Sequence, residues 1–288
     1  MAMIKKISLG RHYFRIALLL RNSVFISSLL NNSEVWYNVS RAEEKQLDDL
    51  DRILMRRICN LPSSAPIPAL YLETGAMRIS TILKARRVNY LHYLAQLPYY
   101  DMLARFFRYQ WGTAQEYDWC HQVRKDLNDL NLPTDLCLIT LKSELSWKTL
   151  VKKQIKNYEF KELMKLKLSL SKLGDLNYSE LVTQNYLLDF NENIAKTILR
   201  FRTRMSNFSG NFKGKEQIKS CPLCGLHEDS QRWVFKCNKV LEAVNITFEY
   251  GDIFKEEIPM EIGPILKTVE KIREDASSGG PSCAPASC

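Results

Sequence analysis

Apolar residues recur at helical spacing through most of this chain, and prolines or glycines interrupt the pattern. The clearest segment begins at Ser40, where Glu43 completes a capping box, and it continues until Asn60 and Pro62. This spacing predicts one helix over about 41–59. Weaker patterns of the same kind predict further helices at about 78–97, 102–109, 118–131, 141–170 and 194–205. We therefore expect a mainly α fold, an irregular assembly of many helices.

Two other segments depart from the helical pattern. A strand signal is confined to about 244–250. The segment 275–288 consists mostly of Ser, Gly, Pro, Ala and Cys, so it cannot bury enough apolar area to offset its ordering entropy. We expect a disordered C-terminal tail there. The apolar run 16–20 is closed by Arg21 and is far shorter than the roughly 20 residues of a bilayer span, so no membrane segment is predicted.

Positive charge is concentrated in one stretch of the sequence. The chain carries 41 Lys and Arg against 32 Asp and Glu, a formal net charge of +9. Residues 141–220 alone hold 16 Lys and Arg against 8 Asp and Glu, so nearly all of the excess lies there. Such a concentration favours an anionic partner, and nucleic acid is the commonest one. We expect RNA or DNA as the partner, with no membrane and no small-molecule substrate.

Basic and aromatic residues share faces on several predicted helices. Arg86, Tyr90 and Tyr93 lie on one face of the helix at 78–97, next to Arg87. Such a face can set guanidinium groups on phosphates and rings against a sugar or base. Alternatively, the tyrosines cap a core and the arginines stay in water. The further phosphate-binding candidates are Lys148, Lys152, Lys156, Arg200, Arg204, Lys213 and Lys215, for which a solvated basic face is the alternative.

A cysteine cluster follows these basic helices. Cys221 and Cys224 are separated by two residues, and His227 and Cys237 follow. Thiolates at this spacing can hold one side of a tetrahedral zinc ion. The expected place for a fourth ligand holds Trp233, whose indole cannot bind metal, and His227 could substitute only if the chain folded back directly after Cys224. The predicted metal ligands are these three cysteines with His227. Bound zinc, weak three-ligand binding and a metal-free remnant all stay open.

No catalytic site is predicted. Asp48 and Asp49 are adjacent in a helix, so their side chains diverge by about 100° and cannot jointly hold Mg²⁺. The sequence contains no Walker loop, dinucleotide-binding glycine motif or nucleophile elbow. Cys59, Cys120 and Cys137 stand singly in apolar helical patterns and are expected to be buried, reduced thiols. We therefore expect an intracellular protein, in the nucleus or cytoplasm, that is not an enzyme.

Several short runs together resemble one protein family. They lie at 10–14, 32–37, 71–75, 86–93 and 201–205, and the Cys-Pro-Leu-Cys cluster follows them. Over about residues 8–245 the chain resembles the region that follows the polymerase domain in the reverse transcriptases of non-LTR, LINE-like retrotransposons. In that family the upstream palm carries the Mg²⁺-binding aspartates, and the family's knuckle has histidine where this chain has Trp233.

The resemblance implies a division of the chain and a role. The implied regions are a thumb-like helical region at 1–112, a basic connector at 113–210, a zinc-knuckle-like segment at 211–245, a short extension at 246–274 and the tail at 275–288. The chain would be a non-catalytic fragment that contacts template and primer phosphates, and a polymerase palm would act in trans. A decayed, a chimeric and a domesticated copy are all compatible with the departure at Trp233. The competing hypothesis is a helical scaffold or interaction protein with no nucleic-acid role.

Overall fold

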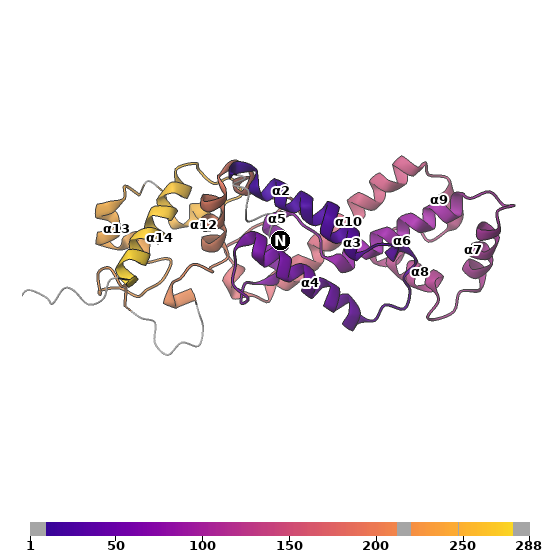
Figure 1. The fold of residues 1–288 in the computed structure, drawn as a ribbon, viewed down its shortest axis with the longest axis horizontal. Helices are drawn as coiled ribbons and strands as arrows, with labels where there is room; N and C mark the ends of the chain where they lie inside the picture. The colour runs from indigo at the N-terminus through magenta and orange to yellow at the C-terminus, as the bar shows by residue number, and fades with distance from the viewer. Residues whose placement is uncertain (1–9, 212–219, 247, 279–288) are drawn as a thin grey trace, which may run out of the picture.

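The computed structural model describes residues 10–211, 220–246 and 248–278, and it consists of helices joined by turns. The α-helices are α2 (Tyr13–Leu20), α3 (Ser27–Leu29), α4 (Arg41–Cys59), α5 (Ile67–Thr74), α6 (Ile79–Gln96), α7 (Met102–Thr113), α8 (Trp119–Asp129), α9 (Leu136–Thr140), α10 (Glu144–Leu168), α11 (Asn185–Asp189), α12 (Glu192–Arg202), α13 (Asn238–Ala243) and α14 (Ile262–Ser278). Shorter turns of helix are η1 (Gly10–His12), η2 (Arg21–Ile26, a π-helix), η3 (Ser33–Val35), η4 (Ser171–Leu173), η5 (Ser209–Asn211), η6 (Val234–Lys236) and η7 (Tyr250–Phe254). The molecule is elongated, with α7, α8 and α9 towards one end and α12, α13 and α14 towards the other (Figure 1). The described residues contain no strand, which confirms the mainly α prediction.

The strongest local signals in the sequence correspond to real elements. In the capping box of α4, the Ser40 amide donates to Glu43 Oε2 at 2.8 Å, and the Glu43 amide donates to Ser40 Oγ at 3.2 Å. The helices α6, α8, α10 and α12 begin and end within a few residues of their predicted limits, while α7 continues to Thr113. The predicted strand at 244–250 is wrong. Its described residues before Tyr250 are irregular chain after α13, and Tyr250 begins η7, because no described strand lies there to pair with.

Several helices were not predicted, and α5 and α14 show two different reasons. In α5 every residue from Pro68 to Thr74 is buried, so the helix has no polar face to set up a periodic pattern. In α14 the buried residues Ile262, Leu266 and Val269 do follow helical spacing, a signal that was present in the sequence. This helix continues through Ser278, so the predicted tail at 275–288 is wrong in its first four positions. Residues 279–288 lie outside the described part of the chain.

Two large hydrophobic cores run through the molecule, and α10 contributes to both. One core joins α2, α4, α5, α11 and α12 with the cysteine segment and α14, and Leu163 packs into it. The other lies among α6, α7, α8 and α9, where Trp147, Val151 and Ile155 enter from the first half of α10. The cores therefore continue across the implied divisions at 112/113 and 210/211. They join segments that are distant in sequence.

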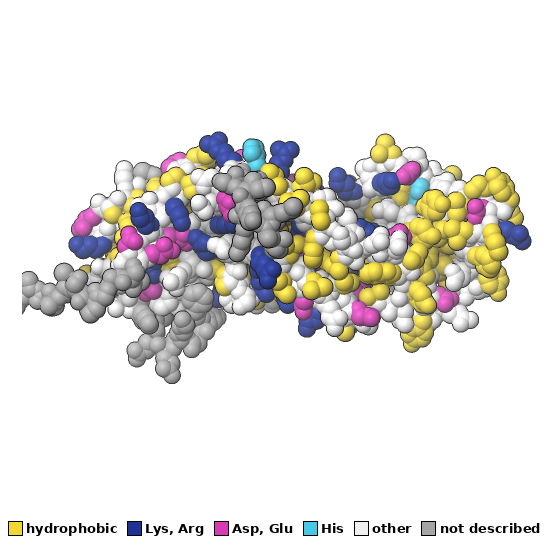
Figure 2. Space-filling view, viewed as in Figure 1, with side chains coloured by type: hydrophobic (Ala, Val, Ile, Leu, Met, Phe, Trp, Pro, Cys, Tyr) yellow, Lys and Arg dark blue, Asp and Glu magenta, His cyan; other side chains and the backbone are white. Residues whose placement is uncertain are grey.

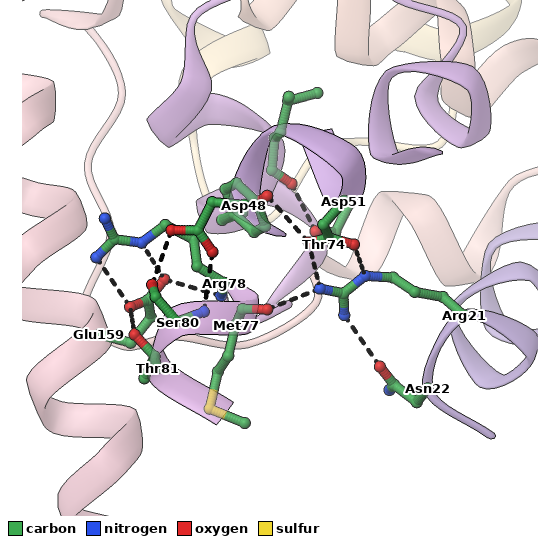
Figure 3. Close-up of polar contacts among 12 residues, drawn as sticks. Arg21, Asn22, Asp48, Asp51, Thr74, Met77, Arg78, Ser80, Thr81 and Glu159 are labelled. Atoms are coloured by element: carbon green, nitrogen blue, oxygen red, sulfur yellow. Dashed lines mark hydrogen bonds and ion pairs between the residues drawn. The ribbon is translucent and has the colours of Figure 1, made fainter. Parts of the chain in front are cut away.

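Buried carboxylates tie the central helices together (Figure 3). Asp51 of α4 accepts from Arg21 Nε at 2.7 Å and from the Tyr71 hydroxyl at 3.0 Å. Glu159 of α10 accepts from Arg78 Nε at 2.8 Å and from the Thr81 hydroxyl at 2.6 Å. Both carboxylates are fully buried, so each balances a buried or half-buried arginine and positions the helix that carries it.

A third buried ion pair joins α5 to α12. Glu73 and Arg202 are fully buried, and Arg202 Nε donates to Glu73 Oε1 at 2.9 Å. The hydroxyls of Tyr178 and Tyr186 donate to the same carboxylate at 2.8 and 3.0 Å. Arg202 also donates to the backbone carbonyl of Ile253 at 2.7 Å, which brings η7 to this junction.

The single cysteines have different environments. Cys59 and Cys120 are buried, as predicted. Cys137 is exposed, so that prediction is wrong: α9 is a helix of five residues that buries only Ile139. None of the helices in the described part of the chain combines the length and apolarity that a membrane crossing needs.

Candidate metal centre and nucleic-acid interface

Three cysteines converge at one end of the molecule. Cys221 and Cys224 lie in the turn after residue 220, and Cys237 is the residue directly before α13. The Sγ atoms of all three lie within 4.8 Å of one another, and those of Cys221 and Cys237 are 3.9 Å apart. Three sulfur atoms at this separation can share one metal ion. Among the described residues, no fourth histidine, cysteine or carboxylate belongs to this group.

The backbone around Cys221 and Cys224 forms a closed turn. The Cys221 amide donates to the carbonyl of His227 at 2.6 Å, and the Gly225 amide donates to the carbonyl of Cys221 at 2.9 Å. Gly225 has φ +68°, a left-handed conformation that glycine adopts without strain. The turn therefore brings the first two sulfur atoms together through its own hydrogen bonds.

Backbone amides surround the sulfur atoms. Burial raises the pKa of Cys224, but hydrogen bonds from the Leu226 and His227 amides and from the other two thiols outweigh burial, so its pKa is lowered. Burial raises the pKa of Cys237 to about 11, although the Val240 amide at the start of α13 acts in the opposite direction. A bound cation would favour the thiolate at each position, since the thiolate is the metal ligand.

His227 does not join the three thiols. Its ring stacks on Trp233, with centroids 5.4 Å apart and planes at 11°. Trp233 also lies under Lys236, whose Nζ is 5.0 Å from the ring centroid. The structure thus brings together three of the four predicted ligands, Cys221, Cys224 and Cys237. The histidine is held against the residue that occupies the expected ligand position.

Two of the predicted phosphate-binding arginines on α6 make internal contacts instead. Arg87 is fully buried, and its Nε donates to Asp126 Oδ2 at 2.6 Å. Lys84, one turn earlier, donates to the same Asp126 at 3.2 Å. Arg86 is half-buried and donates to the backbone carbonyl of Leu30. Neither guanidinium faces solvent freely, so we exclude both from the interface proposed below.

Two further predicted arginines, one in α12 and one just after it, also make ion pairs. Arg200 makes a bidentate contact with Glu270 of α14, at 3.1 and 2.6 Å. Arg204 pairs with Asp175. Lys213 and Lys215 lie outside the described residues. Arg200 is thus neutralised by an acidic residue outside 141–220, and Arg204 by one inside that stretch.

The three predicted lysines of α10 reach the surface, with Lys148 and Lys152 exposed and Lys156 half-buried. Lys148, Lys152 and Lys156 follow one another at four-residue spacing, directly beside the buried row of Trp147 and Val151. Lys148 pairs with Glu144 on the same exposed face, whereas Lys152 and Lys156 make no ion pair with a described acidic residue. We call Lys148, Lys152 and Lys156 the lysine stripe. On the face of the molecule in Figure 2, Lys and Arg form small separated groups, while hydrophobic side chains gather over the end that carries α7.

A hollow of about 270 Å³ lies between α6 and the first turn of α10, and we call it the α6–α10 groove. Its floor includes the stacked rings of His92 and Trp147, whose centroids are 5.3 Å apart. His92 is held by a 2.9 Å hydrogen bond between its Nε2 and the carbonyl of Lys142. The lining residues are Asn89, His92, Tyr93, Gln96, Glu144, Trp147 and Lys148.

The groove brings together two predicted binding residues from distant segments. Tyr93 of α6 and Lys148 of α10 both line it, and Tyr90 stacks on Tyr93 with centroids 5.8 Å apart. Asn89, His92 and Trp147 were not predicted to belong to a site. The sequence does show Trp147 as an aromatic residue within a lysine-rich helix. Its position opposite α6, however, follows only from the fold.

Comparison of this chain with protein-family models, with curated proteins and with solved structures found no match.

Proposed function

We propose that this protein binds RNA or DNA by its phosphates and has no catalytic role. The observation that carries the proposal is the lysine stripe, because Lys152 and Lys156 are free of described acidic partners and Tyr93 lies close to the start of the stripe. The ion pair between Lys148 and Glu144 is exposed, and such pairs contribute little, so a phosphate can replace the carboxylate.

The resemblance to the post-polymerase region of non-LTR retrotransposon reverse transcriptases supports the same proposal. The chain would hold template and primer while a palm in trans supplies the catalytic aspartates. Its longest helix, α10, would present a row of lysines to the nucleic-acid strand. Phosphate contacts of this kind do not depend on the base sequence.

Zinc is the metal that we propose for the three cysteines. Three thiolates at this separation suit zinc, and water or a rotated His227 would complete the coordination. In this role the ion fixes the turn at Cys221 and Cys224 against the start of α13. It would therefore stabilise the segment between α12 and α14 and would take no part in a reaction.

A titration with fluorescent oligonucleotides tests the proposal. At low salt, the full chain should bind a labelled RNA strand, and replacing Lys152, Lys153 and Lys156 together by alanine should weaken binding on the order of tenfold. The matched control replaces three other exposed lysines, Lys239 of α13 and, at the spacing of Lys152 and Lys156, Lys267 and Lys271 of α14, and should bind like the wild type. No affinity of the wild type for either RNA or duplex DNA at low salt would refute the proposal.

One observation favours the alternative, an interaction protein without a nucleic-acid role. The loop before α7 and the helix itself expose several large apolar side chains, with Tyr100 the most exposed at 87%. Exposed aromatic groups of this extent mark interaction surfaces. The residues are Tyr99, Tyr100, Met102, Phe106 and Tyr109. The triple lysine variant separates the two functions, because an interaction protein would bind its partner unchanged.

A further inference from the structure

We infer that the α6–α10 groove binds one unpaired base of the bound nucleic acid, so that the preferred partner is single-stranded. This inference rests on the proposed nucleic-acid binding and adds to it a second kind of contact. The lysine stripe recognises phosphates, which duplex and single strand share. The groove recognises a group that a duplex keeps stacked and paired inside its helix.

The first argument is the chemistry of the groove walls. Trp147 Nε1, a donor, and Asn89 Oδ1, an acceptor, are buried and have no hydrogen-bond partner in the described structure. An unsatisfied buried polar atom is costly, so native proteins rarely keep one without a reason. The edge of a nucleobase presents donors and acceptors side by side. Asn89 and Trp147 both line the groove, so a base that enters it offers partners of the kind that these atoms lack.

The second argument is the shape of the groove. The stacked pair of His92 and Trp147, whose planes differ by 13°, is buried beneath the groove, and the exposed ring of Tyr93 lies at its rim. An exposed aromatic ring such as that of Tyr93 can hold a base by stacking. The volume of about 270 Å³ lies just below the range of about 300–1,000 Å³ typical of ligand pockets, so it suits one flat ring system.

The third argument is the position of the lysine stripe. Lys148 lines the groove, and Lys152 follows one turn later on α10. A strand that places a base in the groove would therefore set its next phosphates along the stripe. Trp147 Nε1 and Asn89 Oδ1 are covered in the free protein, so the base must displace rim side chains. Tyr93 and Lys148 are both exposed, and the ion pair of Lys148 with Glu144 and the stacking of Tyr93 on Tyr90 lie at the surface, so both side chains can turn aside.

The test compares three labelled probes with the full chain at one low salt concentration. The probes are a single-stranded RNA, the same strand with several abasic positions, and the duplex with its complement. The wild type should bind the abasic strand on the order of tenfold more weakly than the intact strand, because stacking and base-edge contacts are lost while the backbone charge is kept. Equal affinity for both strands would overturn the inference.

A variant locates the effect in the groove. Replacing Asn89 by leucine should weaken binding of the single strand about fivefold and leave duplex binding unchanged, because only the base contact is removed. Tyr109→Ala, which removes an exposed ring on α7, is the control and should change neither. If Asn89→Leu weakens both probes equally or neither, the groove does not bind a base. If the wild type binds none of the probes, the proposed function fails as well, so the two failures are distinguishable.

Discussion

Arg87 and Arg202 stand in the sequence beside other basic residues, yet both are fully buried. Each is held by a buried carboxylate, Asp126 for Arg87 and Glu73 for Arg202, that lies far away along the chain. A charge count along the sequence cannot detect such pairs, because the partner is chosen by the fold. Among the predicted basic residues that the structure describes, Lys152 and Lys156 of α10 are the ones without an acidic partner or a buried or half-buried guanidinium.

Two aspartates of α4 provide the first prediction. Asp51 is fully buried against Arg21, whereas Asp48 caps α6, accepting from the Ser80 amide at 2.9 Å. Asp51→Asn should lower the free energy of unfolding by about 3–5 kcal/mol, because it leaves the Arg21 charge buried without its counter-ion. Asp48→Asn keeps the oxygen that caps α6 and should change stability by about 1 kcal/mol or less. Urea unfolding of both variants measures this, and equal losses would contradict it.

Asp48 also leads to a prediction about the pH dependence of stability. Burial raises the pKa of Asp48, although its bonds to Ser80 act in the opposite direction. The folded protein therefore binds a proton at Asp48 more tightly than the unfolded chain does. The contribution of Asp48 to the free energy of unfolding thus increases as the pH falls through the raised pKa. It is complete below the pKa that Asp48 has in the unfolded chain. Asp48→Asn should remove that contribution, and the difference between variant and wild type should change between neutral pH and about pH 4. An unchanged difference would show that Asp48 titrates normally.

At the scale of elements, local signals were sufficient for some helices and insufficient for others. The capping box of α4 lies within four consecutive residues, so the sequence displays it directly. The start of α6 has no such signal. There the backbone amides of Arg78 and Ser80 donate hydrogen bonds to the carboxylates of Glu159 and Asp48, which belong to other helices. The limits of α6 were predicted from periodicity alone, and the reason for its start was hidden in contacts across the fold.

The metal centre, like α6, could be predicted only in part. The spacing of Cys221 and Cys224 indicated a tight turn, and the structure confirms that Cys237 joins them. The position of the His227 ring could not be predicted, because its stacking on Trp233 depends on how the loop between the cysteines folds. The α6–α10 groove was not predicted at all, since its walls come from segments about 50 residues apart, as the bond from His92 to Lys142 shows.

Removal of the metal gives the next prediction. The purified full chain should contain stoichiometric zinc, and a strong chelator should lower its melting temperature, because the ion links the cysteine turn to α13. Cys237→Ala should lose both the zinc and the response to chelator. Cys137→Ala, which removes an exposed thiol on α9, should keep both. A wild-type protein without zinc and without a response to chelator would show that the cluster is a metal-free remnant.

At the scale of the whole molecule, the cores do not follow the divisions that the resemblance implied. Residues as distant as Tyr13 and Val269 belong to one core, and α10 connects it to the other. The helix that carries the lysine stripe is thus held at both ends by the interior. A helix fixed in this way presents its lysines at constant spacing, which is what repeated phosphate contacts require.

The most direct test of phosphate binding is the salt dependence of affinity. For a labelled single-stranded RNA, the logarithm of the binding constant should fall linearly with the logarithm of salt concentration, with a slope of about −2 if roughly three phosphates are neutralised. In the variant that replaces Lys152, Lys153 and Lys156 by alanine, the slope should fall to about −0.7, because Lys148 is the one lysine of the stripe that remains. A wild-type affinity that is independent of salt, or a slope that the triple variant leaves unchanged, would contradict the account.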